Sequence, residues 1–299
     1  MKKIFYFLAF AMLSFAFISC GDDEEGGPNN SQGSQTVTIV TPPAMRNIIV
    51  MVDANGNVSG GHEFTEIASD IFMVDGVKYQ TPDNSNLFVC GYDPEKIKSN
   101  VELISTLIYK GNSMKTYVID SNAFYGCEKL TTIMIPDGLN RIHGAAFSYC
   151  KNLATIAIPS SLQNITSSAF SSCNNMLNVV IYSSSIAEKK TLHEIFGPQV
   201  LKYTLDGNVE RTGTSTFEGC GNLNTVVLSN KVEYLGRNTF SDCPALRHIY
   251  CYATTPPDGI GAFSNTSIER IKVHVPSGSI SAYQASDTWM NFGSIVAIE

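Results

Sequence analysis

Apolar residues recur along the chain at a fixed interval, and this is the clearest pattern in the sequence. The phenylalanines that mark it form two sets of three: Phe124, Phe147 and Phe170, and Phe217, Phe240 and Phe263. Neighbours within a set are 23 residues apart, and the two sets are separated by 47 residues, two periods plus one. An interval of this length indicates a repeat protein in which each unit is one supersecondary element.

Each unit follows the template A-F-x-x-C-x-x-L-x-x-I-x-I-P-x-x-L-x-x-I, as in residues 123–142. The alternation of Ile133 and Ile135 with outward neighbours predicts a half-buried strand that ends at Pro136. Leu139 and Ile142 then supply a second apolar edge. Because 23 residues cannot bury these edges alone, we expect residues 121–278 to stack into a β-rich solenoid with a parallel sheet along one face.

One unit, residues 192–215, departs from the template. Its apolar positions are held by Val200, Tyr203, Leu205 and Val209, whereas Phe196 lies off the period. We attribute this displacement to an insertion near residues 183–186.

Residues 36–120 are less regular but still rich in strand signals. Alternating apolar segments are joined at Asn55-Gly56 and Asp75-Gly76, dipeptides that favour tight hairpin turns. These signals predict a small antiparallel β cap packed on the first repeat. The alternative is that its start forms an independent β module.

Composition agrees with a β-rich chain and excludes one class of partner. Of 299 residues, only 16% are charged, and 27 acidic side chains outnumber 20 basic ones for a net charge of −7. A low charged fraction is typical of turn-dense β proteins. An acidic chain without a basic block is a poor nucleic-acid binder, so nucleic acid is not an expected partner.

The first residues carry a targeting signal. Lys2 and Lys3 precede an apolar run over residues 4–18, which predicts a signal peptide at 1–19; a retained transmembrane anchor is the alternative. Cys20 follows a small residue in a context that resembles the lipobox of bacterial lipoproteins, so Cys20 is the expected lipidation site. Residues 20–35 predict a flexible tether.

The acidic run at residues 22–25 is open to two interpretations. It resembles the export signal that sends lipoproteins to the cell surface in some Gram-negative anaerobes, and it also suits a solvated spacer. The first interpretation predicts an outer membrane lipoprotein exposed at the cell surface, with a membrane contact through the lipid on Cys20.

The repeat template resembles the BspA-type leucine-rich repeat of bacterial surface proteins, from about residue 100 to the C-terminus. The resemblance implies the leucine-rich repeat fold and a non-enzymatic role in adhesion to host matrix proteins or other cells. It also implies a C-terminal cap over residues 279–299, in which residues 279–289 form a short helix over the last repeat.

Five cysteines share one phase of the repeat: Cys127, Cys150, Cys173, Cys220 and Cys243. They predict a column of small buried side chains, because metal sites need ligands that converge from short C-x-x-C pairs.

The five histidines lack metal-site spacing, and no catalytic motif occurs. Residues 53–57, DANGN, begin like a calcium loop but lack its later glutamate, which favours a hairpin turn. We therefore expect no catalytic residue, metal or cofactor.

The outward positions of the predicted sheet are the candidate binding surface. Small neutral residues occupy the first repeats, whereas the basic and aromatic candidates are His248, Tyr250, Arg270, Lys272 and Lys202. Such a patch suits an acidic glycan or an acidic stretch of a host or bacterial surface protein. The alternative is that these charges only keep the last repeats soluble.

Two further functions remain open beside adhesion and protein binding. An accessory glycan-binding lipoprotein would need exposed Trp or Tyr side chains for sugar stacking, and the one tryptophan, Trp289, falls in the expected cap. The third candidate is a structural component of a surface assembly.

Overall fold

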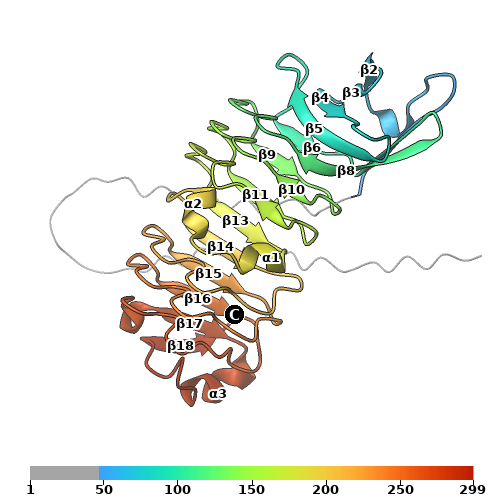
Figure 1. The fold of residues 1–299 in the computed structure, drawn as a ribbon. Coiled ribbons are helices and arrows are strands. Elements are labelled where there is room, and N and C mark those ends of the chain that lie inside the picture. The colour runs from blue at the N-terminus through green and yellow to red at the C-terminus, as the bar shows by residue number, and fades with distance from the viewer. Residues whose placement is uncertain (1–46, 299) are drawn as a thin grey trace, which may run out of the picture. The chain divides into compact units, whose positions relative to one another are not determined.

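The computed structural model describes residues 47–298. The predicted signal peptide, Cys20 and the tether lie outside these residues. The described chain contains two nine-stranded sheets joined through one continuous core (Figure 1). Among residues 47–298, no helix has the length and apolarity needed to span a bilayer.

Sheet A is built mainly from the N-terminal region. Its strands are β1 (Ile49–Val52), β2 (Phe64–Ala68), β3 (Ile71–Val74), β4 (Val77–Gln80), β5 (Asn86–Tyr92), β7 (Thr106–Tyr109) and β8 (Asn112–Ile119), with the 3₁₀ turn η1 (Ser59–Gly61) after β1. Their order is β1-β7-β8-β5-β4-β3-β2, and all neighbours are antiparallel except β1–β7 and β5–β8. The predicted antiparallel cap is therefore a mixed sheet with mainly antiparallel pairs.

Local turn chemistry explains the hairpins of sheet A. Asp75 and Gly76 both have positive φ, 50° and 82°, as a tight two-residue hairpin requires, and they join β3 to β4. The second predicted turn lies between β1 and η1, where the Asp53 carboxylate accepts the backbone N–H groups of Asn55 and Asn57. The DANGN segment is thus a turn closed by its own aspartate.

Sheet A does not stand apart from the repeats. Two short repeat strands, β10 (Arg141–Ile142) and β12 (Asn164–Ile165), continue it: β10 pairs in parallel with β8, and β12 pairs with β10. This pairing favours a cap built onto the first repeats over an independent module.

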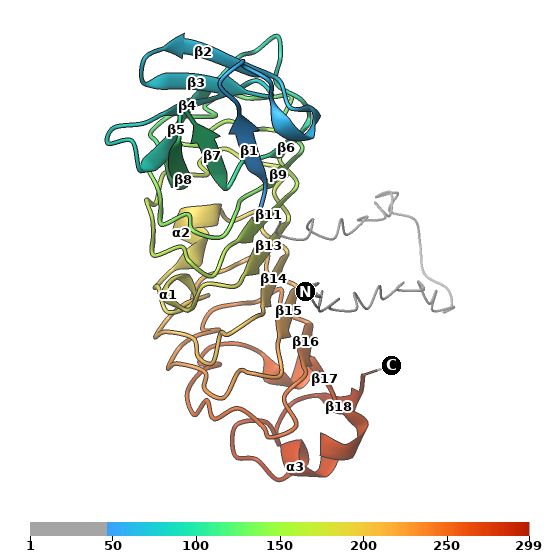
Figure 2. The same ribbon diagram turned by 90° about the vertical axis from the view of Figure 1, so that its right-hand side faces the viewer.

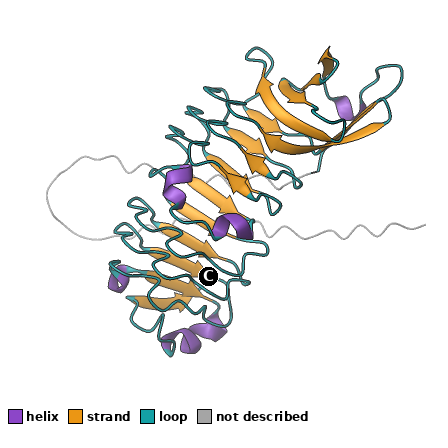
Figure 3. Cartoon of the chain, viewed as in Figure 1, coloured by secondary structure: helices purple, strands orange, loops and turns teal. Residues whose placement is uncertain are grey.

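Sheet B is the parallel sheet that the repeat template predicts. Its strands are β6 (Asn100–Glu102), β9 (Thr132–Met134), β11 (Thr155–Ile158), β13 (Asn178–Ile181), β14 (Lys202–Leu205), β15 (Thr225–Leu228), β16 (His248–Cys251), β17 (Lys272–Val275) and β18 (Ser294–Ala297). All neighbours pair in parallel and in sequence order, so each repeat contributes one strand (Figure 3). The leucine-rich repeat solenoid is confirmed. Its sheet begins with β6, one strand before the first strand of the predicted repeats, β9.

The repeated phenylalanines form a column of stacked rings in the core. Phe147 is fully buried between Phe124 and Phe170, with ring centroids 5.2 and 5.0 Å apart and planes within 4°. Tyr92 continues the column at one end, and Trp289, itself fully buried, closes the other end against Phe263. The column joins every repeat to the next, as stacking of units with apolar edges requires.

The cysteine column is also confirmed, and the structure adds its reason. All five cysteines are buried and unpaired. The thiols of Cys150 and Cys173 donate to the carbonyls of Phe124 and Phe147, 3.1 and 3.0 Å away, so each links two repeats. Burial raises the pKa of Cys173 to about 12, which keeps the thiol protonated and able to donate.

The irregular unit carries two short helices, α1 (Ser184–Ala187) and α2 (Leu192–Phe196), on the side away from sheet B (Figure 2). The placement of its extra residues near 183–186 was wrong. The backbone N–H of Leu192 donates to the carbonyl of Thr216, just as the N–H of each repeated phenylalanine donates to the next repeat, so Leu192 holds the phenylalanine position of this unit. From Leu192 to Val200 there are eight positions, whereas the equivalent interval from Phe217 to Leu223 is six. The extra residues therefore lie in and after α2.

The gap that α2 leaves in the phenylalanine column is filled from the sheet. Phe196 lies 5.4 Å from Phe170, and the ring of Tyr203 on β14 lies 6.2 Å from Phe196 and 4.8 Å from Phe217. The larger Tyr side chain at an inward strand position restores ring contact across the irregular unit.

At the C-terminal end, the helix is shorter than the predicted one over residues 279–289, and a strand follows it. The 3₁₀ turn η2 (Ile268–Arg270) precedes β17, the 3₁₀ turn η3 (Ser277–Ser279) follows it, and the helix α3 (Ile280–Gln284) ends five residues before Trp289. The chain then adds β18 as the last strand of sheet B.

Candidate functional site

The side chains of sheet B that point away from the phenylalanine column form two straight rows, which we call the ladder face; those on β11 and β13 are buried. The first row contains Asn100, Thr132, Thr155, Asn178, Lys202, Thr225, His248, Lys272 and Ser294. The second row contains Glu102, Met134, Ala157, Val180, Thr204, Val227, Tyr250, His274 and Val296. In-register parallel pairing places equivalent residues of successive repeats about 4.8 Å apart.

The last repeats place four of these side chains together, and we call them the His–Tyr cluster: His248, Tyr250, Lys272 and His274. The rings of Tyr250 and His274 stack with centroids 4.1 Å apart and planes 11° from parallel. Nδ1 of His248 lies 3.4 Å from Nε2 of His274. Lys272 is exposed beside them, so the cluster offers a cation next to flat aromatic surface.

Arg270 does not belong to this cluster. It lies in η2, outside sheet B, and its guanidinium lies 3.8 Å from the neighbouring Glu269 carboxylate. The turn adds one residue between Phe263 and β17, since Phe240 precedes His248 by eight positions and Phe263 precedes Lys272 by nine. His274 therefore lies beside Tyr250, and Lys272 lies beside His248. The sequence pattern had indicated Lys272 beside Tyr250 and Arg270 beside His248.

Lys202 lies in the first row, but on β14, two strands away from His248. Burial lowers the pKa of its ammonium. The ladder face also carries one acidic side chain, the exposed Glu102 on its first strand, β6. The face thus carries an acidic side chain on its first strand and a basic one, Lys272, on β17 near its other end.

The histidines of the cluster are uncharged at neutral pH. Burial first, and then the charges of Lys272 and Arg247, lower the pKa of His248. Burial, His248 and Lys272 together lower the pKa of His274 to about 4. At pH 7 the positive charge of the cluster therefore comes from Lys272, and each histidine gains its proton only as the pH falls below its lowered pKa.

This arrangement gives a pH-dependent prediction. Replacing Lys272 by Ala removes the smallest of the three causes that lower the pKa of His274, so this pKa is expected to rise slightly above about 4, while burial and His248 still hold it low. NMR titration of the His274 ring protons measures it directly. Lys129→Ala, in the first repeat, serves as the control, and an unchanged pKa in the Lys272 variant would contradict the electrostatic coupling.

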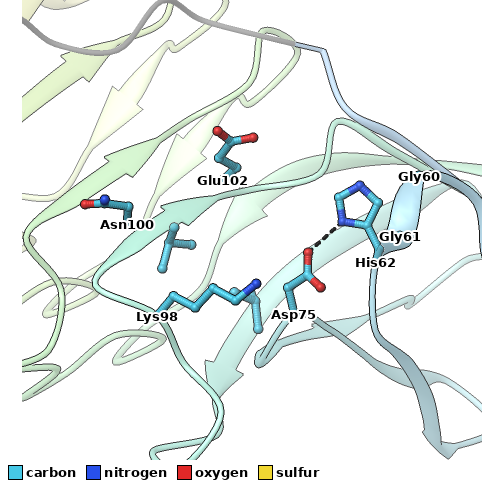
Figure 4. Close-up of a pocket in the computed structure, with 9 residues that line it drawn as sticks. Gly60, Gly61, His62, Asp75, Lys98, Asn100 and Glu102 are labelled. Carbon is cyan, nitrogen blue, oxygen red and sulfur yellow. Dashed lines mark hydrogen bonds and ion pairs between the residues drawn. The ribbon is translucent and has the colours of Figure 1, made fainter.

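A second candidate lies where η1 meets the first strand of sheet B. A hollow of about 310 Å³ is lined by Gly60, Gly61, His62, Asp75, Val77, Lys98, Asn100, Val101 and Glu102. Figure 4 shows His62 and Asp75 pointing toward each other, with Nδ1 and Oδ2 2.6 Å apart, and Lys98 extending toward them. The sequence pattern did not point to this pair, because its members lie in separate loops.

The hollow does not assemble a known catalytic set. A His–Asp pair orients a nucleophile in hydrolases, but its nine lining residues include no serine, threonine or cysteine. Among residues 47–298, no three His, Cys, Asp or Glu side chains come together as metal ligands. The His–Tyr cluster therefore remains the stronger candidate for recognition.

Comparison with known proteins agrees with the repeat architecture. The family model described as the BspA type leucine rich repeat region matches six copies over residues 98–194 and 198–288, more than half of the chain. No curated protein matches the sequence.

Several solved structures align with the chain at low similarity. The T. pallidum leucine-rich repeat protein is 22% identical, with 76% of this chain and 93% of that chain covered and a TM-score of 0.35. A leucine-rich repeat protein from Bacteroides ovatus is 17% identical, covers 76% of each chain and has a TM-score of 0.27. A leucine-rich cell surface protein from Faecalibacterium prausnitzii is 13% identical, with coverages of 78% and 96% and a TM-score of 0.23.

Proposed function

Because the chain belongs to the BspA-type leucine-rich repeat family, we propose that it is a surface lipoprotein that binds proteins through the ladder face. Its expected ligand is an acidic segment of a host matrix protein or of another cell's surface protein. The proposed anchor is a lipid on Cys20, which would hold the protein in the outer membrane with the repeats exposed at the cell surface.

The observation that supports this proposal most directly is the His–Tyr cluster. A rigid parallel sheet holds Lys272 beside the stacked rings of Tyr250 and His274, so the cluster needs little ordering when a ligand binds. A carboxylate can pair with Lys272 while an apolar or planar group of the same ligand lies on the rings. The acidic Glu102 at the far end of the face would disfavour an acidic ligand there.

Binding through this cluster predicts a charge-dependent loss of affinity. The double substitution Lys272→Ala with His274→Ala is expected to weaken binding of a poly-glutamate peptide about tenfold, the effect of losing one charged hydrogen bond of roughly 1.5 kcal/mol. The salt dependence of binding should also flatten, because fewer charges are paired. Titration calorimetry at two ionic strengths measures both effects.

The matched control for this test is Thr132→Ala with Thr225→Ala. Both threonines lie in the first row of the ladder face, away from the cluster, so poly-glutamate affinity should be unchanged. Equal affinity of both double variants and the parent protein would place recognition elsewhere, and the ladder face would then act only as a spacer.

The proposed anchor is tested separately. Cys20→Ala removes the thiol that carries the lipid, so the variant is expected to leave the membrane fraction and become soluble in the absence of detergent. Partitioning of the parent and variant proteins into a detergent phase gives the comparison. Retention of the variant with the membrane would refute the lipoprotein assignment while leaving the binding face untested by this result.

Two other functions remain as alternatives: an accessory glycan-binding lipoprotein and a structural component of a surface assembly. Binding of the purified protein to arrays of matrix proteins and to arrays of polysaccharides distinguishes them. Signal on matrix proteins that is lost in the Lys272 and His274 double variant supports the proposal. Signal confined to polysaccharides favours the first alternative, and no signal on either array favours the second.

A further inference from the structure

The turns that carry the repeated phenylalanines are joined by a regular pair of backbone hydrogen bonds. These turns are residues 123–127, 146–150, 169–173, 216–220 and 239–243, and we call them the phenylalanine turns. In the second turn, for example, the N–H groups of Phe147 and Tyr149 donate to the carbonyls of Ala169 and Ser171 in the third, at 2.8 and 2.9 Å. The first, fourth and fifth of these turns make the same pair of bonds to the turn that follows each of them.

The third phenylalanine turn breaks this pattern. Among residues 47–298, the N–H groups of Phe170 and Ser172 have no protein acceptor. The cause is α2, which occupies the place of the next turn. Its carbonyls at Thr191 and His193 accept instead from Glu194 and Gly197, both at 2.9 Å, as carbonyls of a short helix do. Two donors that are satisfied in every other phenylalanine turn are therefore left open here.

These donors lie at a hollow. A cavity of about 490 Å³ opens between the third turn and α2, within the range of roughly 300–1,000 Å³ typical of small-molecule sites. It is lined by Phe170, Ser171, Ser172, Asn174, His193, Glu194, Ile195, Gly197, Pro198, Gln199 and Asn222. Nδ1 of His193 is buried and has no partner among the described residues. Figure 1 shows α2 at this edge of the repeats, level with β13.

Exposed aromatic surface lies on the neighbouring turn. Tyr149, 45% exposed, belongs to the turn whose N–H groups bond to residues 169 and 171, so it adjoins the Ser171 wall of the hollow. Its ring lies 5.3 Å from that of Tyr125, which is 49% exposed. The two ring planes are 56° apart, so each tyrosine presents its own apolar ring to solvent, that of Tyr149 one repeat away from the open donors.

We propose that this hollow, together with the Tyr125–Tyr149 pair, binds a neutral oligosaccharide. One sugar unit occupies the hollow, and its hydroxyl oxygens accept from the N–H groups of Phe170 and Ser172. The next unit lies on the ring of Tyr149.

The chemistry of the lining favours an uncharged, hydroxyl-rich ligand. The hydroxyls of Ser171 and Ser172 and the amide of Asn174 can both donate and accept, as sugar hydroxyls do. The amide nitrogens of Gln199 and Asn222 already donate to backbone carbonyls, which leaves their oxygens as acceptors. The lining contains no lysine or arginine, and its one carboxylate, Glu194, would repel an anion. The ring of His193 lines the hollow as well, but its Nδ1 is turned away from solvent.

The site is separate from the proposed protein-binding face. The hollow is lined by the third turn and by residues in and after α2. Figure 2 shows α2 on the side of the repeats opposite the strands of sheet B, which form the ladder face. A failure of either proposal therefore leaves the other standing.

Amide NMR of the full-length protein in detergent tests the site with defined probes. Titration with a panel of neutral trisaccharides (maltotriose, cellotriose, mannotriose and N-acetylchitotriose) is expected to shift the Phe170 and Ser172 amide signals in a saturable manner for at least one member. The amides of Phe240 and Asp242, which are bonded within the stack, serve as internal references and should not move. Acetate and N-acetylglycine amide test an anionic or a peptide ligand.

Two variants assign the binding to this hollow. Asn174→Ala and Tyr149→Ala are each expected to weaken binding of the active trisaccharide about three- to tenfold, through loss of one hydrogen bond and of one aromatic contact. Both side chains are exposed, so neither substitution disturbs the core. Tyr234→Ala, which removes a similarly exposed tyrosine (43%) in another repeat, is the matched control and should bind as the parent does.

Three outcomes would overturn the proposal. The first is that no trisaccharide shifts the Phe170 and Ser172 amides, which means that the hollow holds only water. The second is that acetate or N-acetylglycine amide shifts them and the sugars do not. The third is that a sugar shifts both amides but binds with equal affinity to the parent and the Tyr149 variant, which would exclude the tyrosine pair from the site.

Discussion

Substituting Phe147 by Ala is expected to lower the free energy of unfolding by about 3–5 kcal/mol, as large-to-small changes in well-packed cores do. Phe147 has no exposed surface, and its ring is held between two parallel rings 5.2 and 5.0 Å away. The cavity left by its removal would break the ring contacts that join this repeat to the repeats on either side. Urea unfolding followed by tryptophan fluorescence and circular dichroism measures the loss.

Tyr234→Ala is the control for this experiment, because it removes an aromatic ring of similar size that is 43% exposed. It should cost less than about 1 kcal/mol. If the two variants were equally stable, the phenylalanine column would not be the core that joins the repeats.

The second large effect is expected from a glycine. Gly213, Gly236 and Gly259 follow the 23-residue interval, and at Gly213 and Gly236 the backbones of successive repeats are in close contact. A Cβ at Gly236 would overlap the carbonyl oxygen of Gly213, which is backbone and cannot move aside as a side chain can. Gly236→Ala is therefore expected to cost about 3 kcal/mol or more, at the upper end of overpacking effects.

Gly221→Ala separates this steric effect from the general cost of changing a glycine. A Cβ at Gly221 would meet no atom within 4 Å, so its substitution should be close to neutral. Thermal unfolding of the two variants under the same conditions gives the comparison. A Gly236 variant as stable as the Gly221 variant would show that the repeats can separate at little cost.

Much of the fold follows from the sequence because each repeat obeys the same local rules. The alternation in Ile133 and Ile135 defines the strand, and the spacing of Phe124 and Phe147 defines the stack. The buried cysteines were also predictable from their phase, but their role was not. The hydrogen bond from a thiol to a carbonyl of the previous repeat depends on the distance between repeats, which residue spacing alone does not reveal.

The binding face shows where such reasoning fails. Arg270, Lys272 and His274 are two residues apart, so an alternating strand would point all three to the same side. The alternation therefore cannot tell which two of them lie beside His248 and Tyr250. The one residue that the turn η2 adds before β17 decides it, and Arg270 is excluded as a result. The open N–H groups of Phe170 and Ser172 are harder still to foresee, because they arise from carbonyls that α2 uses internally.

The interruption at α2 has a mechanical consequence. Tension applied between the two ends of the described chain passes through every interface between repeats, because each repeat contacts only its neighbours. Sheet B is continuous from β13 to β14, with four residue pairs in register, but the turn side of the same interface lacks the two bonds formed at the other phenylalanine turns. Under load this interface would open first, on its turn side, while β13 and β14 stay paired. The irregular repeat would then be the most flexible point of an otherwise stiff stack of repeats.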